Sequence, residues 1–238
     1  MSPQMPGGGK RDCEACAFRN GSFFPGLKDE HWRRLLSLRT RRNYGRNNIL
    51  FYEKNPPLGL FLLCRGRVKI VRSDCGSRQQ IVRFISAPDL VGVRSLVAGE
   101  PYKATAVVME DSVLCLIPAG AFWRFVRASP AASLALARRL AQQLGAAEET
   151  MTDIALHRLR ERLAKYLIRQ WARRQAGQSW VVIKESRYEI ADSLGSSLEA
   201  ICRALADFRQ RGWIELQGQR LRILNESRLQ AVAHMSAS

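Results

Sequence analysis

The sequence lacks long apolar segments. No run approaches the roughly 20 residues that a helix needs to cross a bilayer, and the first residues, MSPQMPGGGKRD, lack the apolar stretch of a secretory signal. We therefore expect a cytoplasmic protein without a membrane partner. In that compartment its six cysteines stay reduced unless a metal or an oxidant engages them.

The chain also has few groups that suit catalysis. Its three histidines, His31, His157 and His234, are scattered without the spacing of metal ligands. No phosphate-binding P-loop and no nucleophile beside a base can be recognised. We therefore expect that the protein is not an enzyme. A thiol-redox protein that uses Cys13 and Cys16 is the alternative from a different class.

Acidic residues are scarce in comparison with basic ones. The chain has 21 Asp plus Glu against 38 Lys plus Arg, a formal net charge of +17. A surface this cationic attracts polyanions, of which nucleic acid is the commonest. A protein that coats nucleic acid without sequence preference would explain the charge alone, so a specific function needs further evidence.

Short apolar runs broken by turn residues fill the chain from residue 48 to about residue 117. The stretch NILFYEKNPPLGLFLLCRGRVKIVRSDCGSRQQIVRFISAPDLVG contains four such runs, with Gly66 and Gly76 between them. Many short strands with regular punctuation are typical of a β-sandwich or a barrel-like roll. A short amphipathic helix is expected before them, over residues 27–36.

The period changes to that of a helix between residues 131 and 171, where the chain has no proline and one glycine. Apolar residues there recur at alternating spacings of three and four, the pattern of a two-stranded coiled-coil seam. The expected seam consists of Ala137, Leu140, Leu144, Ala147, Met151 and Ile154. The alternative is that this stripe packs on the chain's own roll, the role that we expect for Leu134 and Leu136.

The C-terminal segment has the pattern of a helix-turn-helix with a wing. The pattern predicts a strand over WVVI (180–183). Two helices are then expected to begin at capping boxes, the first formed by Ser186 and Glu189 and the second by Ser196 and Glu199. Gly195 lies in the short turn between the helices, as in a helix-turn-helix. The stretch WIELQGQRLRIL then predicts a hairpin wing around Gly218.

Three residues of the second helix, Glu199, Arg203 and Ala206, face away from its apolar stripe. The start of this helix enters the major groove in helix-turn-helix proteins. We expect Arg203 to bond O6 and N7 of a guanine, and Glu199 to accept from a cytosine or adenine amino group. Glu199 also has the alternative role of a capping residue.

Further DNA contacts are expected from residues around these two. Ser197 and Cys202 share the second helix, although Cys202 lies at the border of the apolar stripe and could simply pack there, or gate DNA binding by oxidation. Contacts to phosphates, which position the protein without reading sequence, are expected from Ser186, Arg187, Arg209 and Arg211.

The order of these parts resembles the cyclic-AMP receptor/fumarate-nitrate reduction regulator (CRP/FNR) superfamily of bacterial transcription factors. The stretch YEIADSLGSSLEAICRALADFRQRGWI is similar to the DNA-reading signature of that family, with its E-x-x-x-R at Glu199 and Arg203, and PDLVG and SVLCLIP resemble its oxygen-sensing branch. The resemblance implies an α+β fold. It consists of a cysteine-containing leader (1–24), a cyclic-nucleotide-binding-type β-roll (25–129), a dimerisation helix (130–158) and a winged helix-turn-helix (159–238).

The resemblance also implies partners. Members of this family read TTGA-like palindromes in double-stranded DNA as homodimers, and most activate transcription by touching RNA polymerase. The sensing branch has a small polar residue where this chain has Cys202, so the resemblance does not carry that contact over. An acidic residue at position 147 would repel its copy in the seam, whereas Ala147 does not. We therefore expect a dimer that depends less on its signal.

The resemblance does not extend to cyclic-nucleotide binding. Members that bind cyclic AMP use a Glu, an Arg and a Ser, and the matching positions here hold Val93, Lys103 and Ala104. A lysine lacks the planar fork of arginine, and valine cannot accept from a ribose hydroxyl. No cyclic nucleotide is expected as a cofactor.

An iron–sulfur cluster is the cofactor that the resemblance implies. The oxygen-sensing branch holds a [4Fe–4S] cluster with three leader cysteines and one distant cysteine, and Cys13, Cys16 and Cys115 match three of them. The third leader position is Ser22 here, or Phe24 in another spacing. Four thiolates are the usual ligand set, so the fourth ligand stays open, with these candidates besides water: Ser22, Asp12, Glu14, Cys64 and Cys75. The alternatives are a regulator without a cluster, and a site that uses thiol oxidation or zinc.

Overall fold

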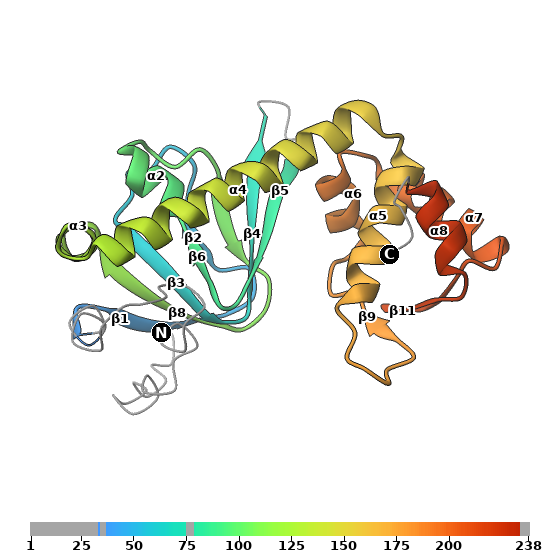
Figure 1. The fold of residues 1–238 in the computed structure, drawn as a ribbon, viewed down its shortest axis with the longest axis horizontal. Helices are drawn as coiled ribbons and strands as arrows, with labels where there is room; N and C mark the ends of the chain where they lie inside the picture. The colour runs from blue at the N-terminus through green and yellow to red at the C-terminus, as the bar shows by residue number, and fades with distance from the viewer. Residues whose placement is uncertain (1–32, 34–36, 75–78, 234–238) are drawn as a thin grey trace. The chain divides into compact units, whose positions relative to one another are not determined.

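The computed structural model describes residue 33, residues 37–74 and residues 79–233 (Figure 1). Eight short strands make up its β-rich part. Their bounds are β1 Thr40–Tyr44, β2 Ile49–Phe51, β3 Gly59–Arg65, β4 Arg67–Ser73, β5 Gln79–Ser86, β6 Asp89–Val91, β7 Thr105–Val108 and β8 Ser112–Pro118. They form two antiparallel sheets, in the orders β1-β8-β3-β6 and β2-β7-β4-β5. The predicted β-roll is confirmed, with β1 as a strand that the sequence pattern did not indicate.

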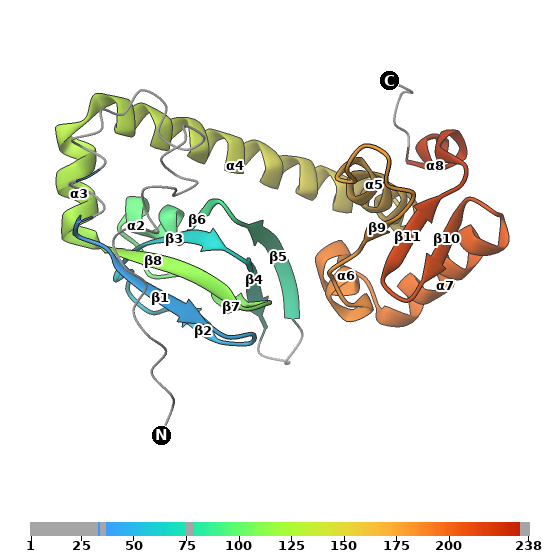
Figure 2. The same cartoon turned by 90° about the horizontal axis from the view of Figure 1, so that it is seen from below.

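Strand β3 is buried on both faces, which explains its unbroken apolar run GLFLLC. Phe61 and Leu63 belong to the core between the two sheets. Leu60 and Leu62 point the other way, because side chains alternate along a strand, and pack in a second core with residues of α3 and α4. Figure 2 shows α3 and the N-terminal part of α4 next to the sheet that contains β3 and β8.

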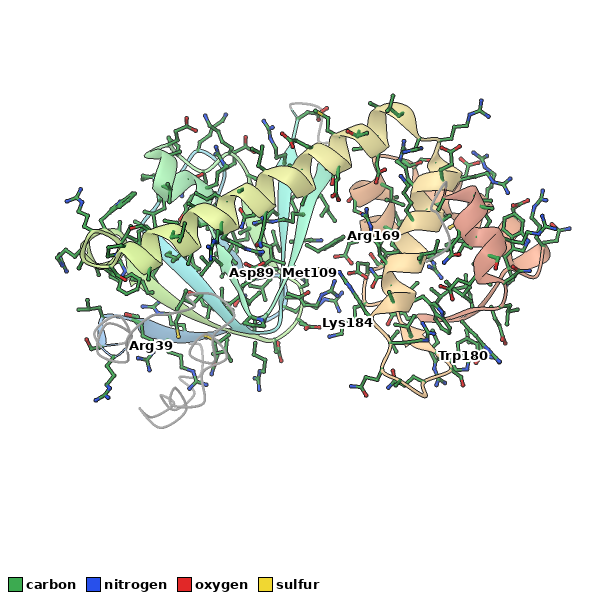
Figure 3. All side chains as sticks on the ribbon, in the orientation of Figure 1. Arg39, Asp89, Met109, Arg169, Trp180 and Lys184 are labelled. Carbon is green, nitrogen blue, oxygen red and sulfur yellow. The ribbon has the colours of Figure 1, made fainter. Side chains whose placement is uncertain are left out.

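Three helices accompany the roll: α2 Val93–Ala98, α3 Ala119–Ala128 and α4 Pro130–Leu156. The first turns of α4 bury Ala132, Ala135 and Leu136. Arg139 of α4 also forms an ion pair with Asp89 at the start of β6, a residue labelled in Figure 3. The expectation for Leu136 is confirmed. That for Leu134 is wrong, because its side chain is 53% exposed and lies outside the packed face.

The C-terminal elements surround a separate apolar core. Their bounds are α5 Leu159–Ala172, β9 Val181–Val182, α6 Arg187–Leu194, α7 Leu198–Gln210, β10 Ile214–Gln217, β11 Arg220–Ile223 and α8 Glu226–Val232. The hairpin β10–β11 confirms the predicted wing, and β9 extends it to a three-stranded sheet. The chain divides by its internal contacts into two compact units, Met1–Leu144 and Gly145–Ser238.

The helical pattern between residues 131 and 171 contains a break that the apolar periodicity does not show, although the resemblance implied a boundary between residues 158 and 159. It lies at His157 and Arg158, between α4 and α5. The Arg158 N–H donates to Glu161 Oε2 over 3.0 Å, and Arg162 Nη1 donates to the His157 carbonyl over 2.7 Å. These bonds satisfy backbone groups that a break leaves unpaired, so an interruption without Pro or Gly is stable.

Several expectations fall outside the described residues. They concern most of the helix over residues 27–36, together with Asp12, Cys13, Glu14, Cys16, Ser22, Phe24, Cys75, Gly76, His31 and His234. No helix in the part of the chain that the structure describes is both long enough and apolar enough to cross a membrane.

Candidate nucleic-acid interface

Helices α6 and α7 form the predicted helix-turn-helix. Gly195 ends α6 in the left-handed conformation, with φ 60° and ψ 50°, which glycine adopts without steric cost. The Ser196 N–H then donates to the Ala191 carbonyl over 3.0 Å and closes the turn. Helix α7 begins two residues later, so the sequence Gly195-Ser-Ser sets the tight angle between the two helices.

The first helix has the cap that the sequence predicted. The Ser186 hydroxyl accepts from the Glu189 N–H over 3.2 Å, and Glu189 Oε2 accepts from the Ser186 N–H over 3.0 Å. This reciprocal pair is a complete capping box. The buried Ile190 and Ala191 then anchor α6 to the C-terminal core.

The cap of the second helix is one residue later than predicted. Ser197, not Ser196, is the N-cap, and its hydroxyl accepts from the Ala200 N–H over 3.2 Å. The residue that could close a box with Ser197 is therefore Ala200, which has no carboxylate. The predicted box between Ser196 and Glu199 is wrong, and Glu199 is available for another role.

This cap gives a stability prediction. We expect Ser197→Ala to lower the free energy of unfolding by about 1 kcal/mol, because it leaves an N–H of α7 without its partner. Ser196→Ala is the matched control and should change it by less than half as much. Denaturant unfolding followed by circular dichroism measures both values. Equal losses would contradict the assignment of the cap.

Helix α7 presents one polar face to solvent. Its buried face consists of Ile201, Ala204, Leu205 and Phe208. On the opposite face Arg203 Nη1 lies 2.7 Å from Glu199 Oε1, and these two side chains are 70% and 77% exposed. The structure therefore brings together the two residues that the sequence singled out for base contacts. Their exposed hydrogen-bonding groups are the kind that reads base edges in the major groove.

Cys202 is exposed, next to Arg203 on the outer side of α7. The interpretation that it packs quietly against the core is wrong. On the helical wheel position 202 lies at the edge of the apolar stripe, and the structure places it outside the buried face, which consists of Ile201, Ala204, Leu205 and Phe208. A thiol at this position lies on the same helix as the expected base contacts.

A charged cluster fixes α7 against α5. Asp207 Oδ2 accepts from Arg160 of α5 over 2.6 Å, and Asp207 also accepts from Arg211 Nε over 2.9 and 3.0 Å. The guanidinium of Arg160 lies 5.5 Å from the centre of the Phe208 ring. Arg211, for which we expected a phosphate contact, thus forms an ion pair with Asp207 at the C-terminal end of α7. Arg209 is exposed and has no ion-pair partner among the described residues.

Basic residues also line the wing and the start of α6. Arg187 Nη2 donates to the Gly218 carbonyl at the wing turn over 3.5 Å. The guanidinium of Arg220 lies 5.6 Å from the ring centre of Trp180, which Figure 3 labels on the segment that leads into β9. Arg220 and Arg222 are exposed on β11 and were not among the predicted DNA contacts. They alternate with the buried Leu221 and Ile223, and this alternation could have indicated that both arginines lie on the outer face of the wing.

The expected seam residues form a mostly exposed stripe on α4. Leu144, Met151 and Ile154 are 61%, 67% and 45% exposed in the single chain, and Ala137 and Ala147 are exposed too. Leu140 is half-buried because it contacts the core beneath α3 and α4. Exposed large apolar residues on one helix commonly mark a protein–protein contact.

The positions that match the cyclic-nucleotide cassette lie around α2. Val93 is buried at 1% exposure, and Lys103 Nζ lies 3.7 Å from Glu100 Oε2. Ala104 offers no polar side-chain atom. Beside them, Tyr102 stacks on Phe51 with 3.6 Å between ring centres, and burial raises the pKa of Tyr102 to about 12.

Two family models match the two parts of the fold. The model of the cyclic nucleotide-binding domain matches residues 41–129, and that of the Crp-like helix-turn-helix domain matches residues 161–232. Together they cover the roll, from β1 to α3, and the module that contains α6, α7 and the wing.

Proteins of known name align with most of the chain. The chain is 27% identical to the "CRP-like cAMP-activated global transcriptional regulator" of Mycobacterium tuberculosis, over 79% of this chain and 85% of that protein. It is 26% identical to the "Transcriptional activator protein FnrA" of Stutzerimonas stutzeri, over 79% of this chain and 78% of that protein. The solved structure of FixK2 from Bradyrhizobium japonicum has the same fold, with a TM-score of 0.74 and 22% identity over 84% of this chain and 98% of that one. These matches, together with the helix-turn-helix, identify the chain as a member of the CRP/FNR family, whose proteins are DNA-binding transcription regulators and not enzymes.

Proposed function

We propose that this regulator binds a TTGA-like palindrome in double-stranded DNA as a homodimer and responds to oxygen or redox state. The observation that carries the sequence-reading part is the exposed pair of Glu199 and Arg203 at the N-terminal end of α7. In DNA, Arg203 would bond a guanine while Glu199 accepts from an amino group of the neighbouring pair. Arg187 and Arg209 would contact phosphates on either side.

Dimerisation is supported by the stripe on α4. A helix whose large apolar residues remain 45% to 67% exposed gains free energy when a second copy covers them. A twofold axis along this seam would present two copies of α7 to two half-sites. Because position 147 holds Ala147 in place of an acidic residue, no charge in the seam opposes pairing.

The test of this function is a comparison of two duplexes. We expect the full chain to bind a TTGA-containing palindrome at least about 1,000-fold more tightly than a scrambled duplex of the same length, the lower end of the range for specific regulators. Fluorescence anisotropy at one fixed salt concentration measures both affinities, because the phosphate contribution depends on salt. A ratio near one would support non-specific binding, driven by the charge of +17, in its place.

We propose activation through RNA polymerase as the regulatory output. The support is that a relative with 26% identity is a transcriptional activator protein, together with the family's usual mode of action.

We also propose that the roll does not bind a cyclic nucleotide. The buried Val93 cannot accept from a ribose hydroxyl, and Lys103 lies beside Glu100 and lacks the fork that holds a phosphate.

The proposed sensor is an iron–sulfur cluster on Cys13, Cys16 and Cys115. Cys115 is a buried thiol on β8, which has the soft donor chemistry that such clusters require. When bound, the cluster would supply reversible redox chemistry. Its signal has a physical route to the seam, because Cys115, Phe122 of α3 and Leu136 of α4 share one apolar core. A shift at Cys115 would therefore press on α4, which carries the dimer stripe.

A further inference from the structure

Two thiols lie side by side in the roll. Cys64 on β3 and Cys115 on β8 have their sulfur atoms 3.7 Å apart, although the residues are 51 positions apart in the chain. Cys115 is buried and Cys64 is half-buried. Both belong to the core that the roll shares with α3 and α4. One thiol of the pair is thus open to a small reagent in solution, and the second lies in contact with the first.

The strand geometry produces this contact and leaves it adjustable. Leu62 of β3 pairs directly with Cys115 of β8, and Cys64 is two residues further along β3. The register shifts between Leu63 and Arg65, so Cys64 is the extra residue of a β-bulge. A bulge disrupts the ladder locally and occurs often beside functional sites. The backbone at Cys64 is therefore less constrained by cross-strand pairing than the rest of β3.

The two sulfurs are close enough to become bonded. A disulfide needs a distance of about 2.05 Å, so the sulfurs must approach each other by about 1.7 Å. A cysteine that changes between staggered χ1 rotamers moves its sulfur by about 3 Å, which is more than this approach requires. Cys64 is the residue that can turn, because it is half-buried, whereas Cys115 is 2% exposed and packed in the core.

The exposures of the two thiols assign them different roles. Redox-sensitive cysteines are commonly accessible to solvent and lie next to a second cysteine that resolves the first oxidation product. Cys64 has the accessibility of the first kind. Cys115 has the position of the second, because a reagent reaches it less easily than the Cys64 sulfur does.

We propose that a hydroperoxide converts Cys64 and Cys115 into a disulfide. This inference rests on the response to redox state in the proposed function and names the thiols that carry it. The Cys64 sulfur attacks one oxygen of the hydroperoxide, and the O–O bond breaks. Cys64 becomes a sulfenic acid, while the peroxide is reduced to water or an alcohol that takes the thiol proton. The Cys115 sulfur then attacks the Cys64 sulfur, the S–O bond breaks, and the hydroxyl group leaves as water with the proton of Cys115.

The disulfide would change the packing beneath α4. Both sulfurs share their core with Leu136 and Leu140 of α4, the helix that carries the stripe of the proposed seam. Oxidation is thus a local change with a route to dimerisation. We expect it to change the affinity of the wild type for the palindrome by at least about 5-fold, the lower end of couplings between distinct sites, and to leave that of Cys64→Ser unchanged.

Peptide mapping of the full chain tests the link directly. The protein is purified in reductant and chelator, so that the thiols are reduced and free of metal, and is then treated with hydrogen peroxide. The remaining thiols are alkylated, and the chain is digested with trypsin. Cys64 and Cys115 fall in separate peptides, 55–65 and 104–124, each with a single cysteine. We expect mass spectrometry to find these two peptides joined, and the joined species to disappear after reduction.

Two variants separate the roles of the two thiols. In Cys64→Ser the joined species should be lost, and the buried Cys115 should stay reduced. In Cys115→Ala the sulfenic acid at Cys64 should accumulate and be trapped by dimedone, and circular dichroism shows whether this variant is folded. Cys202→Ser, which removes an exposed thiol on α7, is the matched control and should form the link like the wild type.

Three results would contradict the proposal. A wild type in which both thiols remain open to alkylation after peroxide treatment would overturn the link, as would joined peptides that pair Cys64 or Cys115 with Cys13 or Cys16. Equal affinities of the oxidised and reduced wild type for the palindrome, with the link formed, would overturn its regulatory role. Binding of the palindrome by the reduced protein is a separate readout of the proposed function, because the helix-turn-helix contains neither Cys64 nor Cys115.

Discussion

Replacing Arg203 with alanine is expected to weaken binding to the palindrome by at least about 10-fold while leaving binding to scrambled DNA nearly unchanged. A bidentate arginine–guanine contact contributes about 1–3 kcal/mol of discrimination, and a dimer has two copies. The loss should be confined to specific binding, because Arg203 lies on the outer face of α7, 70% exposed, and supports no core contact. Anisotropy titrations of both duplexes measure the effect.

Arg209→Ala is the matched control. Arg209 is exposed near the end of the same helix, where we expect a phosphate contact. Its loss should lower the affinity for both duplexes by a similar factor and reduce the slope of affinity against salt. Should Arg209→Ala reduce the ratio of specific to scrambled binding more than Arg203→Ala does, the assignment of base reading to Arg203 is wrong.

The second large effect is expected at the seam. Aerobically purified wild-type protein should sediment as a dimer, and Met151→Glu should convert it to monomer. The substitution removes an apolar side chain that contributes about 1.5–3 kcal/mol when fully buried and brings two like charges together across the twofold axis. Both copies are affected, so the dissociation constant should rise by at least about 100-fold. Sedimentation velocity over a range of concentrations measures it.

The control for the seam is Gln142→Glu. Gln142 is exposed on the opposite face of α4, so the same charge there should leave the dimer intact. Since binding to the palindrome requires two reading helices, Met151→Glu should also lose it, whereas Gln142→Glu should keep it. A wild type that sediments only as monomer would contradict the seam.

Much of the DNA-reading module could be predicted from local patterns. The Ser186 cap, the Gly195 turn and the buried face from Ile201 to Phe208 depend on residues near one another in the chain, so short-range chemistry determines them. The same local reasoning placed the N-cap of α7 one residue too early, at Ser196 in place of Ser197. Ser196 and Ser197 have equal capping propensity, and only the length of the turn decides between them.

What the sequence could not show depends on distant contacts. The break at His157 contains no helix-breaking residue, so the local pattern did not show it and only the resemblance implied a boundary there; bonds from Arg162 and Glu161 stabilise its backbone. The pairing of β1 with β8 joins Thr40 to Leu116, and no local pattern reveals such a partner. The proximity of Cys64 and Cys115 likewise follows from strand register and a bulge.

The close pairing of Glu199 with Arg203 in the free chain does little to restrict how recognition could diverge among descendants of this regulator. The two residues are one helical turn apart, and their side chains lie 2.7 Å from each other and are open to solvent, so the pair contributes only about 0.3–0.5 kcal/mol. Breaking it to let each side chain turn to its own base therefore costs little, and a substitution at one of the two positions should remove one base contact while leaving the other available.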